Sequence, residues 1–545
     1  MSDVALSPSA RVLTDPHLLY ATFTFVPLDT DFQDRHLAPC ATVCRAFYQP
    51  VVRVLWRSLY SMLPLWHLLA PHELKVPRHI DVFGCAQYLI HVILAQLYLD
   101  STRWERFLWH ANHVRNLHHG SGSSPQVNQA HSILIEAVLA RNSGKTFLPL
   151  LSSLHWTSRI HTDGSLLPFL TSTVQCVLFS PMNGQFPEDT LTIRKLRESS
   201  PDLRELNIDG EPTPSLVREV LAGFDGLRDV SISLCADFSV FCALVTKPNL
   251  RSLRIVNAIG PWAGVSQPIT VHDLRKLSVG GHAEADLASL FRLTRFQSLE
   301  ELTVQIYAHT AIPTTMAGIT ALFDDLSGAV SASDLQTLTI SGTFSSLGPP
   351  PDHLPFLRDL LSRILRLSTI RSFRFSSDNP LAKLDGADIE ALARAWPRLT
   401  HLHLDAGAFD RNSTVPVDGL SHLYSHCPDL QEVSLPVLSV PGIGAQSFPS
   451  PPGRSSHRLR SLSTQGIFTS RGGISDEEVE ALARYLLRLF PRLNPETHQR
   501  ALEQTDSVVA EGSSDALRID PAWLKVTEYV YSIRSKGDEY ELHSM

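Results

Sequence analysis

The chain has 545 residues, of which 43% are hydrophobic and 19% are charged, and its formal net charge is -8. This balance excludes a largely disordered or fibrous protein, and the length excludes a single compact core, which leaves several domains or an elongated repeat array. Because the charge is acidic and no basic run occurs, we expect no nucleic acid among the partners.

The N-terminal sequence has no basic start followed by an apolar stretch, so it does not resemble a secretion signal. The longest apolar run, Tyr88 to Leu99, is interrupted by His91 and Gln96 and falls short of the roughly 20 residues that a membrane helix needs. Seven scattered cysteines fit reduced thiols rather than a disulfide framework. We therefore expect no membrane partner and a cytoplasmic or nuclear location.

Residues before about 150 read as helices, and one stretch of them carries a known motif. The sequence from Leu37 to Leu59, LAPCATVCRAFYQPVVRVLWRSL, resembles the second half of an F-box, which is a small helical motif. We expect one apolar core from its side chains at Leu37, Val43, Leu55, Trp56 and Leu59. The expected domains are an F-box-like all-α module over residues 1–75 and a helical linker with the N-terminal solenoid cap over residues 76–145.

From about residue 146 a six-residue pattern recurs, with apolar residues at its first, fourth and sixth positions. Ten clear copies have the first positions Leu203, Leu227, Leu250, Leu274, Leu299, Leu335, Ile370, Leu399, Leu430 and Leu459. Two looser copies begin at Leu151 and Val174. The first positions lie 23 to 36 residues apart, and most of these spacings are in or near the leucine-rich-repeat range of about 20 to 29 residues.

The pattern has a structural meaning. Side chains alternate along a strand, so the fourth and sixth residues point to one face, while the residues between copies return the chain to the next parallel strand. Branched or aromatic residues at the sixth position favour strands over a helical repeat. We therefore predict an α/β leucine-rich-repeat solenoid over residues 146–470, a horseshoe with a parallel sheet inside and helices outside.

The C-terminal part, residues 471–545, is predicted to be a cap helix and a tail. Ser475 followed three residues later by Glu478 is typical of a helix capping box. The apolar side chains behind this box form one stripe at Val479, Leu482, Leu486 and Leu489. Two stretches rich in proline and serine, residues 344–355 and 436–458, are predicted to be exposed loops.

The binding surface follows from the same pattern, because residues between the buried positions project from the open face of the sheet. We expect target-binding residues at Glu205, Asn207, Asp229, Arg254, Lys276, Glu301, Gln305, Arg374, His401 and His403. This mixture of polar groups and both charge signs is typical of a protein-facing surface. For any one of these residues, simple solvation is an equal alternative.

No motif indicates catalysis, a cofactor or a metal. A phosphate loop ending at Gly144-Lys145-Thr146 would need a glycine where Leu139 stands. His401 and His403 have no third ligand in the pattern. Asp324 and Asp325 are sequence neighbours, which do not face one another on a helix. We expect a chain that is not an enzyme.

With these repeats behind it, the N-terminal motif makes the chain similar to F-box and leucine-rich-repeat proteins, which are substrate receptors of SCF-type cullin-RING ubiquitin ligases. The resemblance implies an unidentified target protein on the repeats and a ligase adaptor subunit bound through Leu37, Val43, Cys44, Phe47, Leu55 and Trp56. The family's opening Leu-Pro-x-Glu is absent from His17 to Leu28. A protein-binding scaffold without a ligase connection therefore stays open, as does an N-terminal segment that only caps the solenoid.

Overall fold

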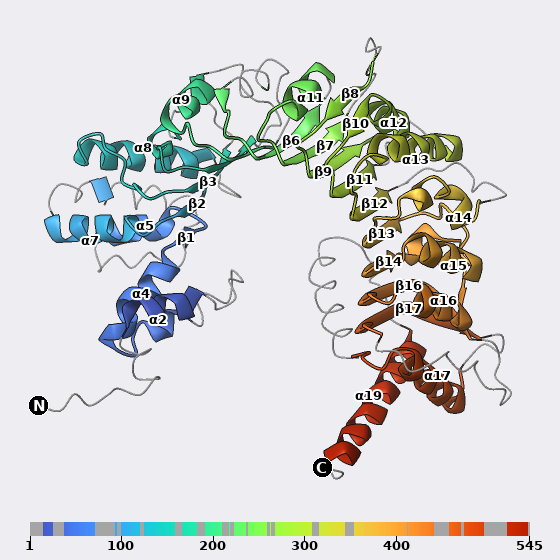
Figure 1. Ribbon diagram of the computed structural model, residues 1–545. Coiled ribbons are helices and arrows are strands. Elements are labelled where there is room, and N and C mark those ends of the chain that lie inside the picture. The colour runs from blue at the N-terminus through green and yellow to red at the C-terminus, as the bar shows by residue number, and fades with distance from the viewer. Residues whose placement is uncertain are drawn as a thin grey trace, which may run out of the picture. The chain divides into compact units, whose positions relative to one another are not determined.

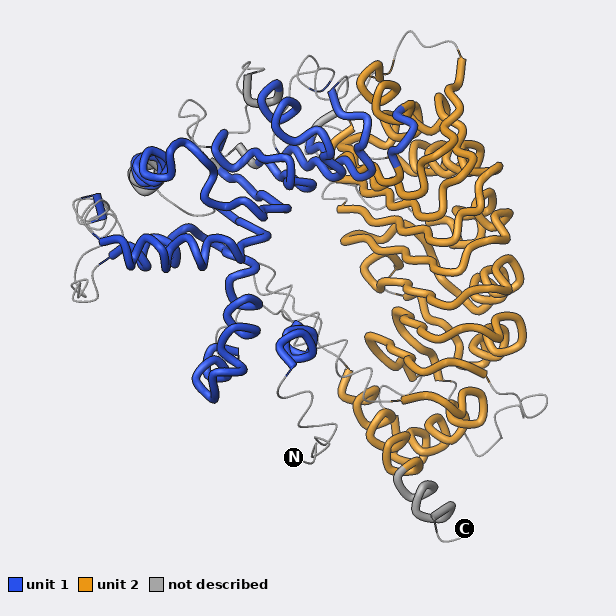
Figure 2. The backbone as a smooth tube through the Cα atoms, turned by 60° about the vertical axis from the view of Figure 1, so that its left-hand side comes forward, with its two compact units in different colours: residues 1–234, 247–250 blue, residues 235–246, 251–545 orange. Residues whose placement is uncertain are grey.

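The computed structural model divides into two compact units (Figure 2): unit 1, residues 1–234 and 247–250, and unit 2, residues 235–246 and 251–545. The residues that the structure describes are 15–24, 37–70, 93–94, 100–119, 125–158, 166–181, 191–209, 217, 223–235, 238–258, 262, 267–307, 315–343, 354–410, 412–440, 457–469, 474–494 and 520–542. No helix in these ranges is both long enough and apolar enough to span a membrane.

Unit 1 contains a parallel sheet in which each strand pairs with the next strand along the chain. Its strands are β1 (Ser58–Leu59), β2 (Asn116–His119), β3 (Ser153–Ser158), β4 (Cys176–Pro181), β5 (Glu205–Ile208) and β6 (Asp229–Cys235). Its helices are α2 (Pro16–Thr24), α4 (Arg45–Leu55), α5 (Leu63–Leu69), α7 (Ser101–Ala111), α8 (Pro125–Arg141), η1 (Leu167–Phe169) and α9 (Leu191–Ser199).

Unit 2 has a second run of parallel strands, with return helices on one side of the sheet (Figure 1). The run consists of β7 (Ser252–Ala258), β9 (Lys276–Gly281), β11 (Glu301–Tyr307), β12 (Thr337–Thr343), β13 (Ser372–Ser377), β14 (His401–Leu404), β16 (Glu432–Val440) and β17 (Ser461–Thr469). The short strand β15 (Val415–Pro416) pairs with β16, and β8 (Ile269–Val271) pairs with β10 (Thr294–Phe296).

The return segments of unit 2 are mostly helical. They are α11 (Phe238–Val245), α12 (Glu284–Arg292), α13 (Met316–Val330), α14 (Leu357–Leu360), η2 (Ile364–Arg366), α15 (Gly386–Ala395), η3 (Ala406–Ala408), η4 (Val417–Gly419) and α16 (Leu420–His426), and they are followed by α17 (Asp476–Leu489) and α19 (Pro521–Leu542). One strand with its return segment forms a rung of the solenoid.

The ten clear copies of the six-residue pattern all coincide with strands. Each strand begins two residues after the first position, as in Leu203 and Glu205 or Leu335 and Thr337. The first and fourth residues of all ten copies are between 0% and 4% exposed. The predicted parallel strands with alternating burial are therefore confirmed, and the chain has the α/β architecture of a leucine-rich-repeat solenoid.

Within each unit, a repeated backbone contact links neighbouring rungs. The carbonyl of the second-position residue accepts hydrogen bonds from two consecutive amides of the following rung. Arg371 O, for example, accepts from Thr400 N at 2.6 Å and from His401 N at 3.1 Å, and in unit 1 Arg57 O accepts from Arg115 N at 2.8 Å. The polar backbone groups at the start of each strand are thus satisfied without side chains, so the rungs tolerate sequence variation there.

The parallel sheet begins earlier than residue 146, the start expected from the sequence. Strand β1 lies within the range given to the helical module and β2 within the range given to the helical linker. Trp56 and Val114 stand two residues before these strands and are their first positions. The sequence predicted only helices here, because the sixth positions, Ser61 and His119, are not apolar.

The helix predicted after Ser475 forms as α17, whereas the predicted tail contains a second helix, α19. Ser475 Oγ accepts a hydrogen bond from Glu478 N at 3.2 Å, and Glu478 Oε2 accepts one from Ser475 N at 2.9 Å, so the capping box is confirmed. Helix α19 packs on α17 and β17 and buries Trp523. Asp520 Oδ2, just before α19, accepts from Ile467 N of β17 at 3.0 Å.

Of the two predicted exposed loops, most of each lies outside the described residues. Residues 344–353 and 441–456 are not described. The remainder of the second stretch was wrongly predicted, since Pro436 to Val440 belongs to β16. It continues a strand because Leu438 and Val440 are buried and the segment pairs with β17.

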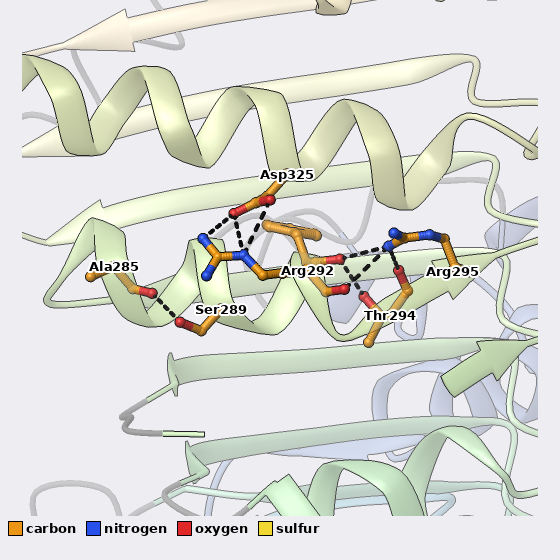
Figure 3. Close-up of polar contacts among 7 residues, drawn as sticks. Ala285, Ser289, Arg292, Thr294, Arg295 and Asp325 are labelled. Carbon is orange, nitrogen blue, oxygen red and sulfur yellow. Dashed lines mark hydrogen bonds and ion pairs between the residues drawn. The ribbon is translucent and has the colours of Figure 1, made fainter. Parts of the chain in front are cut away.

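Neighbouring return helices are joined by surface ion pairs (Figure 3). Arg292 Nη2 at the end of α12 lies 2.8 Å from Asp325 Oδ2 of α13. The adjacent Asp324 pairs with Arg363, whose Nε lies 3.4 Å from its Oδ1. These two carboxylates therefore link separate neighbours in the stack.

Candidate protein-binding surfaces

The open face of each unit, formed by third- and fifth-position side chains of the strands and by the seventh-position Gln305, holds the predicted target-binding residues. In unit 1, Glu205 and Asp229 are exposed and Asn207 is half-buried. In unit 2 the exposed members are Arg254, Lys276, Arg374 and His401, and the half-buried members are Glu301, Gln305 and His403. The set is thus divided between the units, with three residues on unit 1 and seven on unit 2.

Two charged pairs occupy the β9 and β11 rungs of unit 2. Arg275 Nη1 lies 3.0 Å from Glu300 Oε1, and Lys276 Nζ lies 2.7 Å from Glu301 Oε1. All four side chains are more than a third exposed, so the pairs contribute little to stability. Their main effect is to neutralise each other's charge at the start of these two strands.

The β13 and β14 rungs carry a different charge pattern. Arg371 and Arg374 are exposed, and neither side chain has an ion pair or hydrogen bond with any residue in the described ranges. In the sheet register, Arg374 stands beside His403. Burial lowers the pKa of His403, the charge of Arg374 lowers it further, and Asp405 raises it. The histidine is therefore neutral at physiological pH and leaves the positive charge to the arginines.

The open face of unit 1 begins with an aromatic ladder that the sequence did not reveal. The rings of Tyr60 and His118 stack with centroids 5.1 Å apart, and His118 Nδ1 lies 3.1 Å from His155 Nδ1. Burial is the main cause that lowers the pKa of both histidines. All three are fifth-position residues. Tyr60 and His118 can be found once Trp56 and Val114 are taken as first positions of the six-residue pattern.

Neither the pair of His118 and His155 nor the pair of His401 and His403 forms a metal site by itself. Among the residues that the structure describes, no three side chains of His, Cys, Asp or Glu gather closely enough to hold an ion. His401 Nδ1 instead lies 2.9 Å from Thr400 Oγ1, and His155 Nε2 lies 3.2 Å from Thr157 Oγ1.

The N-terminal helical cluster, formed by α2, the helical turn at residues 37–40, the turn at residues 41–43 and α4, has a small core of its own. That core contains Leu19, Phe23, Leu37, Val51 and Val54, with Tyr20, Cys40, Ala41, Phe47 and Leu55 packed against it. The rings of Phe23 and Phe47 meet edge to face at 5.5 Å. Two of the residues expected in this core, Leu37 and Leu55, therefore belong to it.

The other three residues expected in this core lie elsewhere. Val43 is 68% exposed, because it belongs to the turn before α4 rather than to the helix. Leu59 is buried in β1, and the ring of Trp56 packs on His110 of α7 with centroids 4.2 Å apart. The expectation of one core from these residues was wrong, because their segment also forms the first rung of the repeats.

The six residues expected to contact an adaptor are therefore in different environments. Val43 and Cys44 are exposed, Leu37 is buried, and Phe47, Leu55 and Trp56 are half-buried. Leu18 on α2, which the sequence did not single out, is 45% exposed. An accessible apolar surface on this cluster thus includes Leu18 and Val43.

Comparison with known proteins finds similar solved structures but no matching family. No protein-family model and no curated protein matches the sequence. Among solved structures, the leucine-rich repeat-containing protein LegL7 of Legionella pneumophila is 10% identical over 63% of this chain and 92% of its own, with a TM-score of 0.29. A chain of the Rad7 and Elc1 complex in yeast is 14% identical over 68% of this chain and 87% of its own, with a TM-score of 0.31.

A leucine-rich-repeat protein of Leptospira interrogans is 12% identical over 72% of this chain and 97% of its own, with a TM-score of 0.21. At such TM-scores these likenesses carry no argument about function. The repeating strand and return segment of the chain itself identify the leucine-rich-repeat solenoid.

Proposed function

We propose that this chain is a target receptor of an SCF-type cullin-RING ubiquitin ligase, acting in the cytoplasm or nucleus. The N-terminal helical cluster binds the adaptor subunit of the ligase, and the open faces of the repeats bind a target protein. The chain itself catalyses no reaction and uses no cofactor in this proposal. One observation carries it: a two-helix cluster with a small core of its own, on which Leu18 and Val43 are exposed, passes directly into a solenoid, since α4 ends at Leu55 and β1 begins at Ser58.

The exposed apolar surface of the cluster supports an adaptor contact. Val43 is 68% exposed and Leu18 is 45% exposed, although five apolar residues beside them are fully packed. Contiguous exposed apolar patches mark contact surfaces, and we take Leu18 and Val43 as candidates for such a patch. Tyr48 is 44% exposed, and its ring also stacks on Trp109 of α7.

The division of labour within each rung supports target binding. First- and fourth-position side chains fill the core, whereas the open-face residues contribute little to folding and can vary in chemistry. Partner recognition is the function that such a surface serves in stacked repeats.

The adaptor contact can be tested with the full-length chain and the purified adaptor subunit. We expect the double variant Leu18→Asp with Val43→Asp to weaken adaptor binding by at least about tenfold, because two charges would be buried in an apolar interface. Gln49→Asp, a charge at an exposed polar position of α4, is the matched control. Trp56→Ala is unsuitable, because it would disturb the first rung.

Two outcomes would contradict the ligase connection. One is a folded wild-type chain that binds no adaptor, and the other is a double variant that binds as well as the wild type. The first outcome would favour the alternative of a free-standing protein-binding scaffold. That alternative draws on α2, whose sequence PHLLYATFT occupies the place of the family's Leu-Pro-x-Glu.

A further inference from the structure

The open face of unit 2 offers an internal comparison between two positively charged places. Arg275 directly before β9 and Lys276 at its start each meet a carboxylate at the same position of the next rung, Glu300 and Glu301. The sheet spacing of about 4.8 Å thus brings a cation and a carboxylate of neighbouring rungs into contact. Cations at equivalent positions elsewhere should find the same kind of partner wherever the chain supplies one.

At β13 the chain supplies none. The rung before it places Gln336, Thr337 and Thr339 beside the strand, and the rung after it places Thr400, His401 and His403. These residues carry no carboxylate, and burial keeps His403 neutral by lowering its pKa. Arg371 and Arg374 therefore keep their full charge at the surface.

Two carboxylates lie nearby and have other arrangements. Asp405, at the end of β14, accepts hydrogen bonds at Oδ1 from Gly407 N at 3.3 Å and from Gln465 Nε2 at 3.2 Å. Asp378 follows β13 and is exposed, and no ion pair joins it to either arginine. Neither carboxylate replaces the partners that Glu300 and Glu301 provide on β11.

We propose that Arg371 and Arg374 bind a carboxylate-rich segment of a partner protein. Arg371 directly precedes β13 and Arg374 is the third residue of that strand, and both side chains are exposed, so one short acidic segment over this rung can meet both guanidinium groups. Guanidinium groups bind carboxylates through two parallel hydrogen bonds. The rings of His401 and His403 stand at the adjacent third and fifth positions and can donate further hydrogen bonds to the segment.

A protein segment fits this surface better than a nucleic acid. The open face also carries Glu301 and Glu432, and the whole chain has a formal net charge of -8. A long polyanion would be repelled outside the β13 and β14 rungs, whereas a short acidic peptide can stay within them. The inference deepens the target-binding half of the proposed function and does not depend on the ligase connection.

The test uses the full-length chain and a fluorescein-labelled octaglutamate peptide, with binding followed by fluorescence anisotropy at low and moderate salt. We expect saturable binding that weakens with salt, and a rise in Kd of about tenfold or more in the double variant Arg371→Gln with Arg374→Gln. The matched control is Arg366→Gln with Arg398→Gln, which removes two exposed arginines outside the strands. We expect this control to change Kd less than about threefold, because screening limits the effect of distant surface charges.

Three outcomes would overturn the inference: no binding of octaglutamate, an equal loss in the control, or tighter binding of an octathymidine oligonucleotide to the same rungs. Adaptor binding measured on the same samples separates the two proposals. A chain that binds adaptor but not octaglutamate loses only this inference. A chain that binds octaglutamate through the arginines but no adaptor loses only the ligase connection.

Discussion

The early rungs of unit 1 and the rungs of unit 2 share one backbone plan but fill it differently. At the sixth position, β2, β3 and β4 have His119, Trp156 and Phe179, whereas β11 and β12 have Val304 and Ile340. In both units a second-position carbonyl accepts two amides of the next rung. The rung is therefore defined by its buried first and fourth residues and by this backbone link, and its sixth residue is free to vary.

The variation changes the chemistry of the core. In unit 1, the buried ring of His119 packs on Trp156 with centroids 4.2 Å apart and on His131 with centroids 5.1 Å apart. Burial lowers the pKa of His119 to about 3 and that of His131 to about 4. The aliphatic residues at the sixth positions of β11 and β12 have no titratable group. The β2 rung of unit 1 should therefore be more sensitive to acid than the β11 and β12 rungs of unit 2.

The largest expected effect on stability comes from removing a buried side chain from the core of unit 2. Phe373 is 1% exposed and packs on Trp396 with ring centroids 4.7 Å apart. We expect Phe373→Ala to lower the free energy of unfolding by about 3 to 5 kcal/mol, because a buried ring leaves a cavity. Urea unfolding measures the loss. Thr339→Ala on the open face is the control, and an equal loss there would contradict the assignment of faces.

The acid sensitivity of unit 1 should depend on His119. Its pKa in the folded chain lies below the unfolded value of 6.5, so stability is present above about pH 6.5 and is lost as the pH falls toward 3. At pH 5 this costs about 2 kcal/mol relative to neutral pH. We expect His119→Leu to remove that part of the loss in urea unfolding at pH 7.5 and pH 5.

His17→Leu, which removes an exposed histidine of α2, is the control for this pH experiment. If His119→Leu leaves the difference between the two pH values unchanged, the histidine is not part of a dry core and the contrast between the units disappears.

Loss of a helix cap should have a smaller effect on stability, and the two units differ in this feature as well. Helix α17 begins with a full capping box at Ser475, whereas Cys44 before α4 makes no side-chain cap. We expect Ser475→Ala to cost about 1 kcal/mol in thermal or urea unfolding. Ser368→Ala, at an exposed position with no cap, should be neutral, and equal effects of the two changes would contradict the capping role.

The smallest effect is expected at the surface of the return helices. Arg292→Ala removes the ion pair with Asp325, but the arginine side chain is 63% exposed. We expect the unfolding free energy to change by less than about 1 kcal/mol, and less still at high salt. A loss comparable to that of Phe373→Ala would show that these ion pairs, and not the buried first- and fourth-position side chains, hold the stack together.

Much of the solenoid could be predicted from the sequence because its core residues recur at fixed positions of one six-residue pattern. All ten clear first positions precede a strand by two residues. The same alignment contains the pair of Lys276 and Glu301, since both occupy third positions of neighbouring rungs. The first two rungs escaped prediction because Trp56 and Val114 open frames that end in Ser61 and His119 rather than in an apolar residue.

The N-terminal helical cluster was harder to predict, because an apolar residue does not say which neighbour covers it. Val43 and Leu37 lie close in the sequence, yet one is in a turn and 68% exposed while the other is 2% exposed. Trp56 belongs to the same motif but packs on α7, which lies far along the chain. Such choices depend on long-range packing that no local pattern records.

Amide hydrogen exchange, resolved to short peptides by mass spectrometry, is the most direct test of the backbone arrangement. It shows whether the early rungs of unit 1 have the same paired hydrogen bonds as the rungs of unit 2. The amides of Arg115 and Asn116 donate to Arg57 O, and those of Arg371 and Ser372 donate to Gln336 O. We expect both pairs to be protected, with β2 as clearly shielded as other strands of unit 1. Exchange of residues 115–119 at the rate of an unstructured chain, with residues 371–375 protected, would contradict a solenoid that begins at Ser58.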